Sequence, residues 1–271
     1  MRIAFFVATL LLALAPYQAE AAPRVAASIA PVQSLIAEVM NGIGTVDLIV
    51  PPGASPHAYA LRPSEASILA NADLVVRIGP LEVFLDRPLN ALAGDALRLD
   101  LADVPGTTRL AADTHNHGNI DPHLWLDPEN AKLWLAAIAD ALTKLDARNA
   151  DRYRANAQKA AAEMDALIAE IDSTLAPVRG RPYIVFHDAY RYFAHRFGME
   201  AAAAVSLGDG RSPGARHLTG LRATIRDSGA KCVFAEPQFA PDLLHPVTEG
   251  LDVRISTLDP LGRCEGPRPA G

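Results

Sequence analysis

The hydrophobic pattern of the first half of the chain alternates between short apolar runs and longer amphipathic stretches. Short runs bounded by turn residues predict strands, and apolar positions three and four residues apart predict helices. The predicted strands are 24–29, 45–50, 73–79 and 95–101, and the predicted helices are 31–42, 63–72 and 81–94. Strands separated by helices favour a parallel sheet with helices on both faces.

The segment from Pro128 to Val178 lacks strand signals and predicts a long amphipathic helix. Apolar residues recur there at steps of three and four, at Tyr153, Ala157, Ala160, Met164, Leu167, Ile171 and Leu175. A helix of about 30 residues spans about 45 Å. A coiled coil is the alternative, but the stripe is rich in alanine and covers only about three heptads. We therefore favour a helix that packs along the body of the protein and bridges two lobes.

The alternation of strands and helices resumes after Pro182. The predicted strands are 183–188, 200–207, 231–236 and 252–259, and the predicted helices are 189–198, 214–229 and 240–250. The predicted fold class is therefore α/β, with two doubly wound parallel-sheet lobes joined by a long rigid helix. We expect a signal peptide at 1–21, an N-terminal lobe at 22–145, the linking helix at 146–178 and a C-terminal lobe at 179–271.

The N-terminus has the pattern of a secretory signal peptide. Arg2 precedes an apolar run over 3–16, and Ala19 and Ala21 supply the small residues of a cleavage site. The run is too short to span a bilayer comfortably, since spanning needs about 20 residues. A buried N-terminal helix is the alternative. Because no cysteine lies near the cut, we expect an exported protein without a lipid anchor.

Composition and charge exclude some partners. Half of the 271 residues are apolar, which is enough for a sizeable core, and the net charge of −6 is spread along the chain. Without a basic patch, and with few aromatic residues, binding to nucleic acid or to an anionic membrane is not expected. The two cysteines, Cys232 and Cys264, allow one disulfide in an oxidising compartment.

Three of the eight histidines lie where predicted strands end or a helix begins. His57 follows the strand at 45–50, His187 ends the strand at 183–188, and His123 precedes the helix that opens near Pro128. The others lie in predicted helices (His195, His217 and His245) or in a polar loop (His115 and His117). Because loops beyond the carboxyl ends of parallel strands meet at a ligand crevice, the first three predict a metal site in the cleft between the lobes.

Zinc is the metal that this residue set favours. Zinc takes four tetrahedral ligands and accepts neutral imidazole well, whereas manganese prefers carboxylates. One carboxylate, Asp259, ends the last predicted strand in a Leu-Asp-Pro sequence. It is either a further ligand or a turn residue that accepts hydrogen bonds from the next backbone amides.

Six segments resemble the periplasmic zinc-binding receptors of bacterial ABC importers, the cluster 9 metal-binding family. In the order of that family they are PPGASPHAYALRPSE, NADLVVRIGP, DPHLWLDP, FHDAYRYF, CVFAEPQF and TLDPLG. The resemblance implies two α/β lobes on a long helix, with His57, His123 and His187 as zinc ligands. It also implies that Asp259 supplies the fourth ligand, as in some members. A carboxylate replaces His187 in manganese-binding relatives, and relatives carry a disulfide from the strand that contains Cys232.

The chain departs from the family pattern at three places. Pro56 stands where some receptors carry a glutamate, and the loop before His123 has only two histidines, His115 and His117, where many receptors have a long histidine-rich loop. After Gly262 the sequence RCEGPRPAG has no apolar face, so we expect a truncated C-terminal lobe without a covering helix. Cys264 is then an uncertain disulfide partner for Cys232.

The resemblance implies a periplasmic monomer that binds one Zn²⁺ tightly and is not an enzyme. It would deliver the ion to an ABC permease and its ATPase, docking peripherally on the permease. A metal-dependent adhesin or a zinc chaperone is the alternative within the family. A three-histidine zinc hydrolase with Asp188 or Glu236 as general base is the alternative outside it. Asp259 argues against the hydrolase because it would fill the open coordination position.

Overall fold

The computed structural model describes residues 21–112, 119–206, 215–239 and 244–262. Outside these ranges lie residues 1–20 of the expected signal peptide and the tail from residue 263, which includes Cys264. His115 and His117 also lie outside them. Cys232 forms no disulfide with another described residue.

The N-terminal lobe is built on a four-stranded parallel sheet in the order β2-β1-β3-β4. The strands are β1 (Val25–Ala27), β2 (Val46–Leu48), β3 (Leu74–Arg77) and β4 (Leu97–Asp100). The helices are α1 (Ala30–Val39), α2 (Pro63–Asn71), α3 (Asp86–Leu92) and α4 (Pro128–Leu145). Val25 and Ala27 pack with α1 and α4, whereas Ala26 between them packs with α2 and α3. Helices therefore cover both faces of the sheet, and this is why β1 and β3 are almost wholly apolar.

The C-terminal lobe repeats this strand order with a second parallel sheet, β6-β5-β7-β8. The strands are β5 (Ile184–His187), β6 (Ala203–Ser206), β7 (Cys232–Ala235) and β8 (Arg254–Thr257), and the helices are α6 (Arg191–Phe197), α7 (Ala215–Ser228) and α8 (His245–Thr248). Ile184, Phe186 and Val233 pack with Leu221 and Ile225 of α7. All four side chains of the edge strand β8 are exposed, and Ile255 is 47% exposed.

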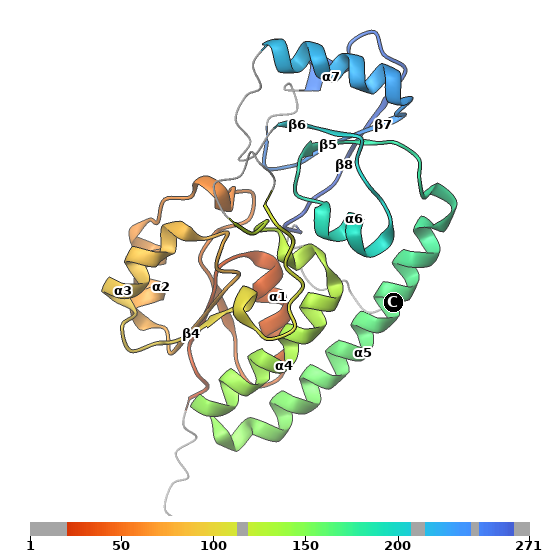
Figure 1. The fold of residues 1–271 in the computed structure, drawn as a ribbon. Coiled ribbons are helices and arrows are strands. Elements are labelled where there is room, and N and C mark those ends of the chain that lie inside the picture. The colour runs from red at the N-terminus through yellow and green to blue at the C-terminus, as the bar shows by residue number, and fades with distance from the viewer. Residues whose placement is uncertain (1–20, 113–118, 207–214, 240–243, 263–271) are drawn as a thin grey trace, which may run out of the picture.

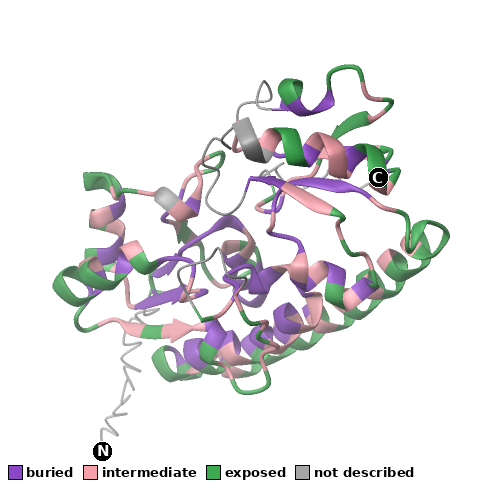
Figure 2. Cartoon of the chain, turned by 45° about the horizontal axis from the view of Figure 1, so that its top comes forward, coloured by how far each residue is buried: buried purple, intermediate pink, exposed green. Residues whose placement is uncertain are grey.

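A long helix, α5 (Ala150–Leu175), runs beside α4 and on to the C-terminal lobe (Figure 1). Its first half is buried against the N-terminal lobe through Tyr153, Ala157 and Ala160. Its second half is mostly exposed, and Leu167 on the same stripe is 44% exposed (Figure 2). The predicted fold class, two parallel α/β lobes with a long helix, is confirmed. The 3₁₀ turns Ala147–Asn149 and Ala176–Val178 flank α5 at its two ends.

Asp127 ties the two lobes together at the start of α4. Its carboxylate accepts hydrogen bonds from the Glu129 amide (3.0 Å) and from Nε and Nη2 of Arg196 in α6 (2.8 Å each). Asp127 is fully buried. It therefore caps α4 and also pairs with a cation from the other lobe.

We expect Asp127→Ala to lower the free energy of unfolding by about 2–4 kcal/mol, because it removes a helix cap and leaves Arg196 without its charged partner. Urea unfolding of the metal-free protein measures the change. Asp151→Ala is the matched control, since the Asp151 side chain is 98% exposed and should contribute at most about 0.5 kcal/mol. Equal losses in the two variants would contradict the role of Asp127.

Candidate metal site

Different local structures hold the three histidines predicted as ligands. His57 lies in the 3₁₀ turn Pro56–Ala58 after β2, and the fixed φ of Pro56 suits the first position of that turn. His123 immediately precedes the 3₁₀ turn Leu124–Leu126, and His187 is the last residue of β5. His123 and His187 are only 2% and 4% exposed, whereas His57 is half-buried.

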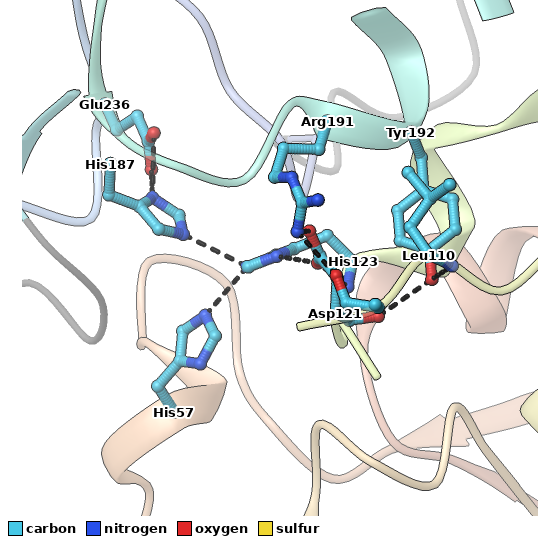
Figure 3. A network of polar contacts seen from close by, with 9 residues as sticks. His57, Leu110, Asp121, His123, His187, Arg191, Tyr192 and Glu236 are labelled. Carbon is cyan, nitrogen blue, oxygen red and sulfur yellow. Dashed lines mark hydrogen bonds and ion pairs between the residues drawn. The ribbon is translucent and has the colours of Figure 1, made fainter. Parts of the chain in front are cut away.

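The structure brings these three side chains together at the junction of the lobes (Figure 3). Nε2 of His123 lies 3.1 Å from Nε2 of His57 and 3.1 Å from Nε2 of His187. Among the described residues, this is the one group of three or more metal-ligating side chains whose ligand atoms lie within 4.8 Å of one another. Two nitrogens bound tetrahedrally to zinc at 2.0–2.1 Å would be about 3.3 Å apart, close to the spacing seen here.

Buried carboxylates orient two of the rings. Oδ1 of Asp121 accepts a hydrogen bond from Nδ1 of His123 at 2.8 Å and another from the His123 amide at 3.0 Å. Both oxygens of Glu236 lie 3.0 Å from Nδ1 of His187. A carboxylate partner keeps the proton on Nδ1, so the lone pair of each ring is on Nε2, which faces the cluster.

Residues from α6 hold Asp121 in place. Nη1 of Arg191 contacts its Oδ2 at 3.3 Å, and the Tyr192 hydroxyl donates to its carbonyl oxygen at 3.0 Å (Figure 3). The same hydroxyl accepts a hydrogen bond from the Leu110 amide at 2.9 Å. The histidine from one lobe is thus oriented through contacts with the other.

Sequence patterns did not indicate Asp121 at all and suggested Glu236 only as a general base. Asp121 could have been found, because it lies two residues before His123 in the Asp-Pro-His sequence. Glu236 could not be paired with His187 from the sequence, because the two residues are 49 positions apart and meet only because β5 and β7 are neighbours.

Asp259 lies outside the histidine cluster. Its Oδ1 accepts hydrogen bonds from Nε2 of Gln238 at 2.7 Å and from the Leu261 amide at 3.1 Å. This is the geometry of a turn residue, one of the two alternatives left open by the sequence. Ligation by Asp259 would require the carboxylate to leave both donors.

The cluster of described residues does not include the remaining histidines. His195 in α6 and His245 at the start of α8 are exposed. His217 falls within α7. That these three histidines are surface or packing residues stays a prediction.

The environment favours the neutral form of His57 and His123 in the metal-free protein. Burial, and then repulsion from His123 and His187, lowers the pKa of His57 to about 3. Burial also lowers the pKa of His123, although Asp121 opposes this shift. Neutral imidazole is the form that coordinates a metal, so protons compete little for these two rings at neutral pH.

Two α/β lobes on a long helix, with three histidines at their junction, define a bilobal metal-binding protein. The family model described as "Zinc-uptake complex component A periplasmic" matches residues 25–269, and the chain belongs to this family. The resemblance noted in the sequence is thereby confirmed. Within the described ranges, no helix has the length and apolar character needed to cross a bilayer.

The chain is similar to proteins named "High-affinity zinc uptake system protein ZnuA". It is 38% identical to the one from Paracoccus denitrificans (strain Pd 1222), over 93% of this chain and 87% of the relative. It is 36% identical to the one from Brucella abortus (strain 2308), over 88% of this chain and 84% of the relative. A crystal structure of a ZnuA deletion mutant with zinc bound superposes with a TM-score of 0.81 at 29% identity, covering 89% of this chain and 91% of that one.

We expect the metal-free protein to lose stability as the pH falls below about 6.5. Unfolded histidine has a pKa of about 6.5, whereas folded His57 stays neutral to about pH 3. Between these values the unfolded chain binds more protons, so the free energy of unfolding rises with pH. For His57 the change from pH 6.5 to 5.5 is about 1 kcal/mol.

Urea unfolding in excess chelator at several pH values measures this dependence. Carboxylates titrate in the same range, so the informative quantity is the difference between the wild-type protein and His57→Asn. His245→Asn is the control, because His245 is exposed. The same pH dependence in wild-type protein and His57→Asn would contradict the lowered pKa.

Proposed function

We propose that the protein is a periplasmic receptor that binds one Zn²⁺ ion through Nε2 of His57, His123 and His187. It would deliver the ion to an ABC permease and its ATPase for uptake. The signal-peptide pattern at 1–21 supports export.

One observation carries this proposal. His123 and His187 each have a carboxylate partner on Nδ1, yet their Nε2 atoms lie only 3.1 Å apart. With the protons on Nδ1, two lone pairs face each other at hydrogen-bond distance without a hydrogen between them. A cation between the two nitrogens turns this repulsion into coordination.

The donor set and the relatives support zinc as this cation. Imidazole nitrogen suits zinc, whereas magnesium, calcium and manganese prefer oxygen ligands. The curated relatives described above carry the name of a high-affinity zinc uptake protein, and they match over most of their length.

The size of the site supports a single ion as its ligand. The cavity beside the three histidines has a volume of about 10 Å³, which has room for about one water molecule but not for an organic substrate. Neither general base considered from the sequence is available at the cluster. Glu236 is bonded to His187, and Asp188 lines a separate cavity with Tyr183 and Arg191.

Each of His57→Ala, His123→Ala and His187→Ala should weaken zinc binding by more than about 100-fold, since loss of an outer partner alone costs 10–100-fold. Competition titration of the purified mature protein against a chromophoric chelator measures the affinity, and metal analysis gives the stoichiometry. His245→Ala is the control. Wild-type affinity in the triple alanine variant would refute the site.

Uptake is tested in a bacterium that lacks its own periplasmic zinc receptor. The wild-type gene should restore growth in chelator-treated medium, and the triple alanine variant should not. Growth of both strains would show that uptake does not need the three histidines, whereas growth of neither despite tight zinc binding in vitro would favour the adhesin or chaperone alternative over import.

We propose Asp259 as the fourth ligand in the zinc-bound state, with water as the alternative. An anionic ligand lowers the charge of the buried ion and hence its desolvation cost.

Asp259→Ala should therefore weaken zinc binding, but by less than loss of a histidine, because water can complete the shell. X-ray absorption of the zinc-bound wild type and variant measures the ligand set. The exposed Asp252, paired with Lys231, supplies the control variant Asp252→Ala. Identical spectra with only nitrogen and water ligands would leave Asp259 as a turn residue.

A further inference from the structure

The two carboxylates behind the histidines differ in their own partners. Asp121 is fully buried and shares its charge with Arg191, so this pair is neutral as a unit. Glu236 is 3% exposed, and its only ion pair among the described residues is with His187. Glu236 therefore places a negative charge beside the cluster that no described arginine or lysine balances.

A buried tyrosine lies close to Glu236. The hydroxyl of Tyr190 is buried, and burial first and the nearby Glu236 carboxylate second raise the pKa of Tyr190. Glu236 follows β7, directly beside the strand that ends in His187. The charge is thus held by the sheet of the C-terminal lobe.

A cluster of three neutral imidazoles does not itself balance a buried divalent ion. Burying an unbalanced charge is costly, and even with Asp259 as the fourth ligand a bound Zn²⁺ would keep one positive charge. The Glu236 carboxylate is separated from the metal position only by the imidazole of His187. It is therefore placed to offset the charge that the ligands leave unbalanced.

We propose that Glu236 is the charge-compensating residue of the site, and that its negative charge makes the three histidines prefer a divalent over a monovalent cation. Cu⁺ is the relevant competitor, because imidazole is also a good ligand for copper. This inference rests on the proposed zinc site and adds the origin of its selectivity for ion charge.

Glu236 can act by orienting the ring of His187 or by its charge, and these two roles give different results. The Coulomb interaction of a fixed charge is proportional to the charge of the ion. Removing the charge should thus weaken Zn²⁺ binding twice as much as Cu⁺ binding on a logarithmic scale. Loss of ring orientation alone would weaken both ions equally.

The test compares Zn²⁺ and Cu⁺ affinities of the mature protein by chelator competition, with Cu⁺ under anaerobic reducing conditions. Glu236→Gln keeps an oxygen acceptor for Nδ1 but removes the charge. We expect Zn²⁺ affinity to fall about 10–100-fold and Cu⁺ affinity by about the square root of that factor, 3–10-fold. Glu236→Asp keeps the charge and should leave the ratio of the two affinities near the wild-type value.

The matched control removes the other carboxylate together with its cation. The double variant Asp121→Asn, Arg191→Gln removes the carboxylate that orients His123, but the net charge of the protein does not change. The affinities for Zn²⁺ and Cu⁺ should therefore fall by similar factors. Glu236→Asp also tests the proposal if Glu236→Gln does not fold, because it shortens the side chain and so disturbs the contact with Nδ1 of His187 while it keeps the charge.

Equal losses for the two ions in Glu236→Gln, or a changed ratio of the two affinities in Glu236→Asp, would overturn the role of Glu236 while leaving the zinc site intact. Absence of zinc binding in the wild-type protein would instead refute the proposed function.

Discussion

The close approach of the Nε2 atoms of His123 and His187 is the constraint on which the site depends. The two rings come from different lobes, and each is held from behind by a buried carboxylate that fixes its lone pair toward the other. Such a contact is unfavourable between neutral rings and favourable around a cation. The lowered pKa of His57 adds to this, because a neutral ring offers no competing proton. The metal-free protein is thus organised for an ion before the ion arrives.

The segment from Asp121 to Pro128 makes the arrangement possible, because it contacts the C-terminal lobe at several points. Asp121 contacts Arg191, and Asp127 pairs with Arg196. The Trp125 indole donates a hydrogen bond to the Pro260 carbonyl at 2.6 Å. The same short stretch therefore carries one ligand, orients it, caps α4 and joins the lobes. A shift of one lobe relative to the other would therefore move His123.

Selectivity for an ion depends on charge as well as on the ligand atoms. Three imidazoles define the type of metal, but they leave the charge of the ion to be balanced by groups further out. Glu236 lies beside the cluster without a described basic partner, whereas Arg191 balances Asp121. In this structure the Asp259 carboxylate accepts a hydrogen bond from Gln238, so Glu236 is the carboxylate that contacts His187.

The sequence by itself determined the order of strands and helices, the long helix and the three histidines, because these depend on local periodicity and on residues at strand ends. It also carried the six segments that identify the family. Only the tertiary structure decided that both sheets share one strand order, since residue-level patterns contain no detectable repeat. It also decided that Glu236 stands behind His187 and that Asp259 turns to Gln238. These pairings join residues 49 and 21 positions apart. They depend on which strands become neighbours and on side-chain rotamers, and neither is encoded in the hydrophobic pattern of a single segment.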